Sequence, residues 1–181
     1  FGVDINYQNK KKRTCMHYLY SDETESTNTD ETLCDFLLSC KPNLRLKDIS
    51  GRSPIHYLFV KLNQEFQTDP LIDPISSLSK LMEYGDVDIE DTDIYGNTPL
   101  HYAVMRGSTI SVLTLFSKKV DINKKNNEGN SPLAYALMFK QPNIAILLIQ
   151  QGAVIDTFAK MIAKRCEKDL IKAMIEKVKE K

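Results

Sequence analysis

The chain has 181 residues, of which 42% are hydrophobic, enough for one ordinary domain or a short stack of repeats. Lys+Arg and Asp+Glu balance at 24 each, so the net charge favours neither nucleic acid nor a membrane surface as a partner. No apolar run is long enough to span a bilayer, and the first residues are not those of a secretory signal. The four cysteines are Cys15, Cys34, Cys40 and Cys166. They show neither metal-ligand spacing nor a disulfide-rich pattern, which predicts an intracellular protein of the cytoplasm or nucleus.

A tetrapeptide recurs four times along the chain. Its copies are Thr14-Cys15-Met16-His17, Ser53-Pro54-Ile55-His56, Thr98-Pro99-Leu100-His101 and Ser131-Pro132-Leu133-Ala134. Successive copies begin 39, 45 and 33 residues apart. A repeat of this size is typical of a stack of small helical units. Such stacks usually bind other proteins.

The N-terminal half of the chain is predicted to contain two lengthened repeats. Residues 1–8 are interpreted as the tail of a preceding repeat, so the chain is expected to begin inside a longer array. The repeats that follow are 9–47 and 48–92. Each is expected to carry an insertion between its helices: the acidic residues 21–31 in the first, and about residues 63–74, with two prolines, in the second.

The C-terminal half is more regular, with repeats predicted at 93–125 and 126–158 and a helical capping repeat at 159–181. In the first of these repeats Gly96 permits a tight turn, Thr98 is placed to cap a helix, and Gly107 is placed to end it. A second helix is expected to follow, and its apolar stripe is Ile110, Val112, Leu113, Leu115 and Phe116.

These turn and helix motifs resemble the ankyrin repeat over nearly the whole chain. The resemblance implies an all-α ankyrin-repeat solenoid of helix-turn-helix units with short β-turn fingers. It also implies a structural role for the tetrapeptide residues, namely Thr14, His17, Ser53, Pro54, His56, Thr98, Pro99, His101, Ser131 and Pro132. All three histidines of the chain belong to this set. We therefore expect no catalytic residue, no metal site and no cofactor.

The resemblance further implies where a partner would bind. Ankyrin proteins usually contact partners with residues that flank the turn glycine and with the last turn of the first helix. These positions are Ile49, Arg52, Lys61, Ile94, Tyr95, Asn97, Met105, Arg106, Asn127, Glu128, Met138 and Phe139. We expect them on the concave face of repeats two to four, centred on Tyr95, Met105 and Arg106. The alternative is that Ile94, Met105 and Phe139 only pack between neighbouring repeats.

The basic run Lys10-Lys11-Lys12-Arg13 has two interpretations. It is compatible with a nuclear localisation or nucleic-acid patch, but the balanced charge of the chain favours a solvated turn. Lys12 occupies the place that Gly51, Gly96 and Gly129 hold in the other repeats. A left-handed lysine costs about 1 kcal/mol, so the first turn is expected to be irregular.

Three functions remain open at this stage. The first is a non-catalytic module that binds a protein or peptide, without a small-molecule substrate, a membrane or nucleic acid as its ligand. The second is the substrate-recruiting region of a larger enzyme, such as a ubiquitin ligase, a kinase or a tankyrase-like poly(ADP-ribose) polymerase. The third is an assembly scaffold in a transcription-linked protein.

Overall fold

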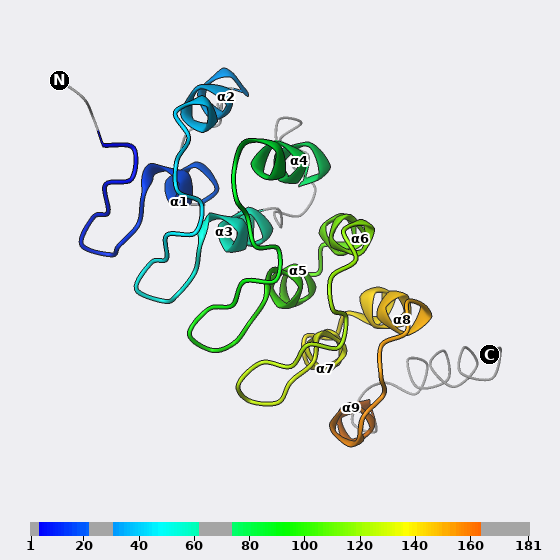
Figure 1. The fold of residues 1–181 in the computed structure, drawn as a ribbon. Helices are drawn as coiled ribbons and strands as arrows, with labels where there is room; N and C mark the ends of the chain where they lie inside the picture. The colour runs from blue at the N-terminus through cyan, green and yellow to red at the C-terminus, as the bar shows by residue number, and fades with distance from the viewer. Residues whose placement is uncertain (1–3, 22–30, 62–73, 164–181) are drawn as a thin grey trace. The chain divides into compact units, whose positions relative to one another are not determined.

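A computed structural model describes residues 4–21, 31–61 and 74–163, and Figure 1 shows them as short helices joined by turns. Within these residues there is no β-strand. The chain divides into two compact units, Phe1–Ile94 and Tyr95–Lys181. We call them the first and the second unit and describe each by itself.

The first unit places its helices in two layers. They are α1 (Cys15–Leu19), α2 (Glu31–Ser39), α3 (Pro54–Lys61) and α4 (Pro74–Tyr84). Helix α3 packs against α1 within one layer and against α4 of the other layer, where α4 also packs against α2 (Figure 1). The side chains between the layers are fully buried and apolar, among them Met16, Leu38, Leu58, Phe59, Leu78 and Leu81. Their removal from water is the main favourable contribution to the stability of this unit.

The second unit repeats this arrangement. Its helices are α5 (Pro99–Arg106), α6 (Thr109–Ser117), α7 (Pro132–Met138), α8 (Pro142–Gln150) and α9 (Thr157–Ala163). Helix α7 packs between α5 and α9, while α6 and α8 form the second layer. Buried leucines join the layers, namely Leu100, Leu115, Leu133, Leu137 and Leu148.

The helices begin where the tetrapeptides predict. Helices α3, α5 and α7 start at Pro54, Pro99 and Pro132, where the missing N–H of proline leaves no hydrogen bond unmade. The Thr98 side chain accepts a hydrogen bond from the amide of His101, which caps α5. Gly107 ends α5 in the left-handed conformation, with φ of 78°. The predicted start and end of this helix are confirmed.

The rings of His17 and His101 hydrogen-bond to backbone groups of their own and of the next repeat. In His17 the Nδ1 atom accepts a hydrogen bond from the amide of Thr14 at 3.0 Å, so the Nε2–H group donates to the carbonyl of Arg52 at 3.1 Å. His101 makes the corresponding bond to the carbonyl of Asn130, also at 3.1 Å. Burial is the main cause that lowers the pKa of His17 and keeps its ring neutral.

The four turns that precede the first helices are residues 9–13, 48–52, 93–97 and 126–130, here called the first to fourth turns. The first turn is closed by bonds from the Asn9 amide to the Arg13 carbonyl (3.1 Å) and from the Lys12 amide to the Asn9 carbonyl (2.8 Å). The second and fourth turns have the same two bonds. Lys12 adopts φ of 55°, close to the 71° of Gly51. The expected irregularity of the first turn is therefore wrong, because the lysine accepts the left-handed conformation and the turn bonds are retained.

Neighbouring turns are joined through their backbones. In the first unit the amide of Ile49 donates to the carbonyl of Lys11 and the amide of Ile94 donates to that of Ser50, both at 3.1 Å. In the second unit the amide of Asn127 donates to the carbonyl of Tyr95 at 2.9 Å. These bonds set the distance between adjacent turns and hold their tips in register.

Helix α6 departs from its expected apolar stripe. Val112 and Leu115 are buried as predicted, but Ile110 and Leu113 are exposed.

The two predicted insertions and the predicted cap fall largely outside the described residues. Of the insertion 21–31 the structure describes only Ser21 and Glu31, and of the insertion 63–74 only Pro74. Of the capping repeat 159–181 it describes residues 159–163. Of the tail 1–8, residues 4–8 are described.

Candidate functional site

The second unit presents large side chains at equivalent positions of adjacent helices. Tyr95 is 59% exposed, and Met138 and Phe139 at the end of α7 are also exposed. Arg106 is exposed at the end of α5, while Met105 beside it is half-buried. Positions 105 and 106 precede positions 138 and 139 by one 33-residue period, and α5 packs against α7. The second unit therefore has exposed apolar and cationic side chains at the ends of two helices that pack together.

Phe139 is supported from beneath by a fixed aromatic residue. Its ring centroid lies 5.6 Å from that of Tyr135, and the ring of Tyr135 also meets that of His101 edge-on at 5.3 Å. The hydroxyl of Tyr135 donates to Oδ1 of Asn97 at 3.0 Å and accepts from Nδ2 of Asn126, also at 3.0 Å. Tyr135 is therefore held at both ends, and the ring of Phe139 lies on a rigid base.

Three of the expected partner-binding residues take part in the turns themselves. Asn97 accepts from both Asn126, at 2.9 Å, and Tyr135. Glu128 accepts from Nδ2 of Asn130 at 3.0 Å within the fourth turn. Asn127 is exposed, and its side chain lies against Gly96 of the preceding turn. Asn97 thus has a structural function, whereas Asn127 and Glu128 remain at the surface.

The first unit exposes two isoleucines at its turn tips. Ile49 and Ile94 are both exposed, although Ile94 also covers Gly51, where an added Cβ would come 2.9 Å from Cγ2 of Ile94. Lys61 is the last residue of α3, and its side chain lies outside the described part of the structure. Among the expected binding residues of this unit whose side chains are described, the two isoleucines are the exposed ones.

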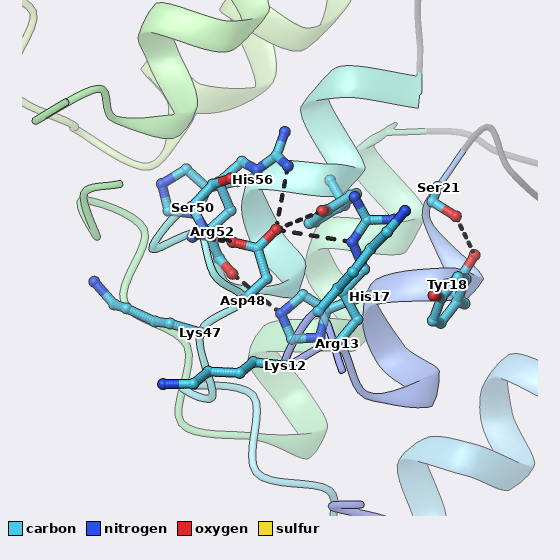
Figure 2. Close-up of polar contacts among 12 residues, drawn as sticks. Lys12, Arg13, His17, Tyr18, Ser21, Lys47, Asp48, Ser50, Arg52 and His56 are labelled. Atoms are coloured by element: carbon cyan, nitrogen blue, oxygen red, sulfur yellow. Dashed lines mark hydrogen bonds and ion pairs between the residues drawn. The ribbon is translucent and has the colours of Figure 1, made fainter. Parts of the chain in front are cut away.

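A buried carboxylate organises the second turn, as Figure 2 shows. The side chain of Asp48 is fully buried, and its Oδ2 accepts from the Tyr57 hydroxyl at 2.7 Å and from Nη2 of Arg52 at 3.1 Å. Nε of Arg13 lies 3.8 Å from the same oxygen. The guanidinium groups of Arg13 and Arg52 lie 5.2 and 4.8 Å from the ring centroid of Tyr57. Both arginines therefore stabilise the junction of the first two turns.

The electrostatics of this cluster follow from burial and hydrogen bonding. Burial would raise the pKa of Asp48, but the hydrogen bonds from Tyr57 and the amide of Arg52 and the charge of Arg52 outweigh it, so the pKa is lowered. Burial, with the hydrogen bond to Asp48, raises the pKa of Tyr57 to about 12. At neutral pH Asp48 is charged and Tyr57 is a neutral donor to it.

The described residues hold no group of three or more histidine, cysteine, aspartate or glutamate side chains that could bind a metal ion. No helix among them is long and apolar enough to cross a membrane.

A family model described as ankyrin repeats (3 copies) matches residues 24–126 and 71–159. The chain belongs to the ankyrin-repeat family. Its fold is accordingly an all-α array of ankyrin repeats, which are protein-interaction modules without catalytic function of their own.

A curated relative is also similar to the repeats. It is described as poly [ADP-ribose] polymerase tankyrase of Caenorhabditis elegans and is 36% identical over 124 residues, which are 64% of this chain. The match covers 5% of the length of that protein, so it compares a small part of that enzyme with this chain.

Sequence reasoning missed the polar junctions between ankyrin turns. In the first, second and fourth turns the first residue bonds its own backbone and also a tyrosine nine positions later: Asn9 pairs with Tyr18, Asp48 with Tyr57, and Asn126 with Tyr135. The spacing is visible in the sequence. Because aspartate or asparagine in a turn is commonplace, the spacing alone did not reveal that the tyrosine closes the junction.

Proposed function

We propose that these ankyrin repeats are a non-catalytic module that binds a partner protein or peptide. The centre of the binding surface is the group Tyr95, Met105 and Arg106, extended by Met138 and Phe139. The observation that carries this proposal is the exposure of apolar side chains at equivalent positions of packed helices. Aromatic residues, methionine and arginine are enriched at the cores of protein interfaces.

The rigid support of these residues favours binding over simple packing. Phe139 is 44% exposed although its ring rests on Tyr135, which hydrogen bonds hold in place. A surface arranged before the partner arrives loses little conformational entropy on binding. We assign the repeats to 9–47, 48–92, 93–125 and 126–158, with the cap at 159–181. We place the protein inside the cell, in keeping with the thiols of Cys15 and Cys40.

The test compares the wild-type chain with the double variant Tyr95→Ala/Met105→Ala. Partners captured from a cell extract are identified by mass spectrometry, and the affinity for each purified partner is then measured. Loss of two side chains at an interface centre is expected to weaken binding about tenfold or more. The matched control is Ile110→Ala/Leu113→Ala, which removes two exposed apolar side chains of the same unit from the other layer.

The outcomes separate binding from packing. Weaker binding with nearly unchanged thermal stability supports the proposal. Binding equal to wild type refutes it. A loss of stability as large as that of a core substitution would show that Tyr95 and Met105 pack the fold.

A second candidate is the substrate-recruiting region of a larger enzyme, and the similarity to the ankyrin region of a tankyrase favours it. The same surface would then hold the substrate of an attached catalytic domain. A catalytic domain in the full-length sequence, together with modification of the captured partner that Tyr95→Ala reduces, would establish this function.

A third candidate is a scaffold that assembles its partners through the insertions 21–31 and 63–74. Binding that survives deletion of both insertions would count against the scaffold and leave the Tyr95 surface as the contact.

A further inference from the structure

We propose that the tips of the first and second turns form a basic docking surface for an acidic segment of a partner protein. This surface lies in the first unit and is made of Lys10, Lys11, Lys12 and Lys47 with the exposed Tyr7 and Ile49. It shares no residue with the Tyr95 group, and the proposal does not depend on that group.

The charges of Lys10 and Lys12, at the tip of the first turn, are not balanced by the described part of the fold. Lys10, Lys11 and Lys12 are all exposed. Among the described residues, Lys10 and Lys12 form no ion pair. Arg13, in contrast, is bound to the buried Asp48, so this aspartate does not neutralise the lysines beside it. Lys10 and Lys12 therefore offer cations to a ligand without breaking an ion pair among the described residues.

One glutamine brings the basic residues together. Nε2 of Gln8 donates to the carbonyl of Lys12 at 2.6 Å and to that of Lys47 at 3.1 Å, so the backbones of these two lysines meet at one amide group. Figure 2 shows the side chains of Lys12 and Lys47 extending toward the same side of the view. Nζ of Lys47 is held by Asp91 at 2.6 Å and by the carbonyl of Thr92 at 2.8 Å, so it borders the surface while Lys10 and Lys12 provide the available charge.

The conformation of Lys12 is a second, independent observation. Its φ of 55° lies in the region that favours glycine, and the second, third and fourth turns have glycine at the equivalent position. A lysine in this conformation costs about 1 kcal/mol. Its side chain bonds to no described residue that would offset the cost.

The surrounding residues favour a protein segment over other polyanions. Two exposed apolar groups accompany the lysines: Ile49, whose amide is bonded to the backbone of Lys11, and Tyr7, three residues before Lys10 in the sequence. They suit a peptide in which apolar side chains alternate with carboxylates. Nucleic-acid binding usually needs a larger number of phosphate contacts than one turn provides.

The experiment measures binding of a fluorescein-labelled peptide of about ten residues, glutamates with two leucines, to the whole chain by fluorescence anisotropy. The test variant is Lys10→Ala/Lys12→Gly. The matched control is Lys118→Ala/Lys140→Gly, which removes two exposed lysines of the second unit, one of them also left-handed with φ of 53°. We expect the test variant to bind about three- to tenfold more weakly and the control to bind as wild type does.

Further arms identify the ligand chemistry. Raising the salt concentration from about 50 to about 300 mM should weaken wild-type binding, because the contacts are exposed charges. A peptide with glutamine in place of glutamate should not bind. Equal affinity of the wild type and the test variant would overturn the proposal, and so would tighter binding of single-stranded oligothymidine or of anionic phosphatidylserine vesicles. Thermal unfolding of the test variant should show no loss of stability, which excludes misfolding as the cause.

Discussion

The two units join their ankyrin turns with the same geometry but different chemistry. In the first unit the junction is ionic, since Asp48 is buried between Arg13 and Arg52 and hydrogen-bonded to Tyr57. In the second unit the junction is neutral, and the amides of Asn97 and Asn126 meet the hydroxyl of Tyr135. The positions along the repeat are equivalent, so the fold requires a satisfied polar junction and not a particular charge.

The difference has an energetic consequence. Removal of one member of a buried ion pair leaves a buried charge without its partner, which is strongly destabilising. Removal of one amide leaves only neutral polar groups without a hydrogen bond, and their burial costs less free energy. The ionic junction should therefore be more sensitive to substitution and to acid. The predictions that follow test this contrast, beginning with the largest expected effect.

Asp48→Ala should be the most damaging single change at a junction. It leaves Arg13 and Arg52, which are 11% and 23% exposed, without their carboxylate. It also removes the bonds that cap the amides of Ser50 and Arg52. We expect a loss of about 3 kcal/mol in the free energy of unfolding, measured by urea denaturation.

Asn126→Ala is the matched change in the second unit and should cost about 1 to 2 kcal/mol. Equal losses at the two positions would contradict the view that the ionic junction is the more sensitive one.

The glycine of a junction should tolerate a side chain less well than the glycine of a turn without a close neighbour. A Cβ on Gly96 would lie 2.8 Å from the backbone nitrogen of Asn127, while one on Gly129 would meet no described atom within 4 Å. Both glycines have φ near 80°, so the conformational penalty of alanine is shared. We expect Gly96→Ala to be about 1 kcal/mol more destabilising than Gly129→Ala in thermal denaturation. The reverse order would show that adjacent turns can move apart freely.

Acid should weaken the ionic junction and spare the neutral one. The folded pKa of Asp48 is lowered, so the unfolded chain binds the proton more readily. The stabilisation is complete above the unfolded pKa of about 3.9 and is lost as the pH falls through the folded pKa. The lowered pKa of His17 acts in the same direction, beginning near its unfolded value of about 6.5.

Asp48→Asn should therefore flatten the decline of stability with pH below about 4, although the variant is less stable than wild type at pH 7. Urea denaturation over a series of pH values measures both effects. An unchanged slope would exclude Asp48 as a source of the acid sensitivity.

The smallest effect is expected at the tip of the first turn. Lys12→Gly relieves a left-handed lysine and should raise the free energy of unfolding by up to about 1 kcal/mol, less the entropy that glycine adds to the unfolded chain. Lys140 lies just after α7 and has the same left-handed conformation, so Lys140→Gly should change the free energy of unfolding by a similar amount. Thermal denaturation decides the sign, and a loss of stability in the first variant alone would show that the Lys12 side chain supports the fold.

Much of the fold could be predicted from single residues. Thr98, Pro99 and Gly107 act through the backbone next to them, so they predict the start and the end of a helix without knowledge of the rest of the chain. Copies of the tetrapeptide, spaced by 39, 45 and 33 residues, identified the repeats, and the resemblance to the ankyrin repeat implied a structural role for each histidine before any contact was known.

The binding surface could be predicted less well, because exposure depends on what packs beside a residue. Arg52 and Asn97 occupy positions that bind partners in other ankyrin proteins, yet here they bond to Asp48 and Tyr135. Ile110 and Leu113 belong to an apolar stripe but remain exposed.

The sequence by itself determined the repeat and the starts of the first helices, since these follow from local backbone chemistry repeated along the chain, and through the family resemblance it indicated the protein-interaction class. Only the tertiary structure decided which polar residues hold the turns together and which side chains are available to a partner. Those properties arise between residues of adjacent repeats, such as Arg13 and Asp48 or Asn97 and Tyr135, which lie 35 and 38 positions apart in the sequence and meet only when the repeats stack.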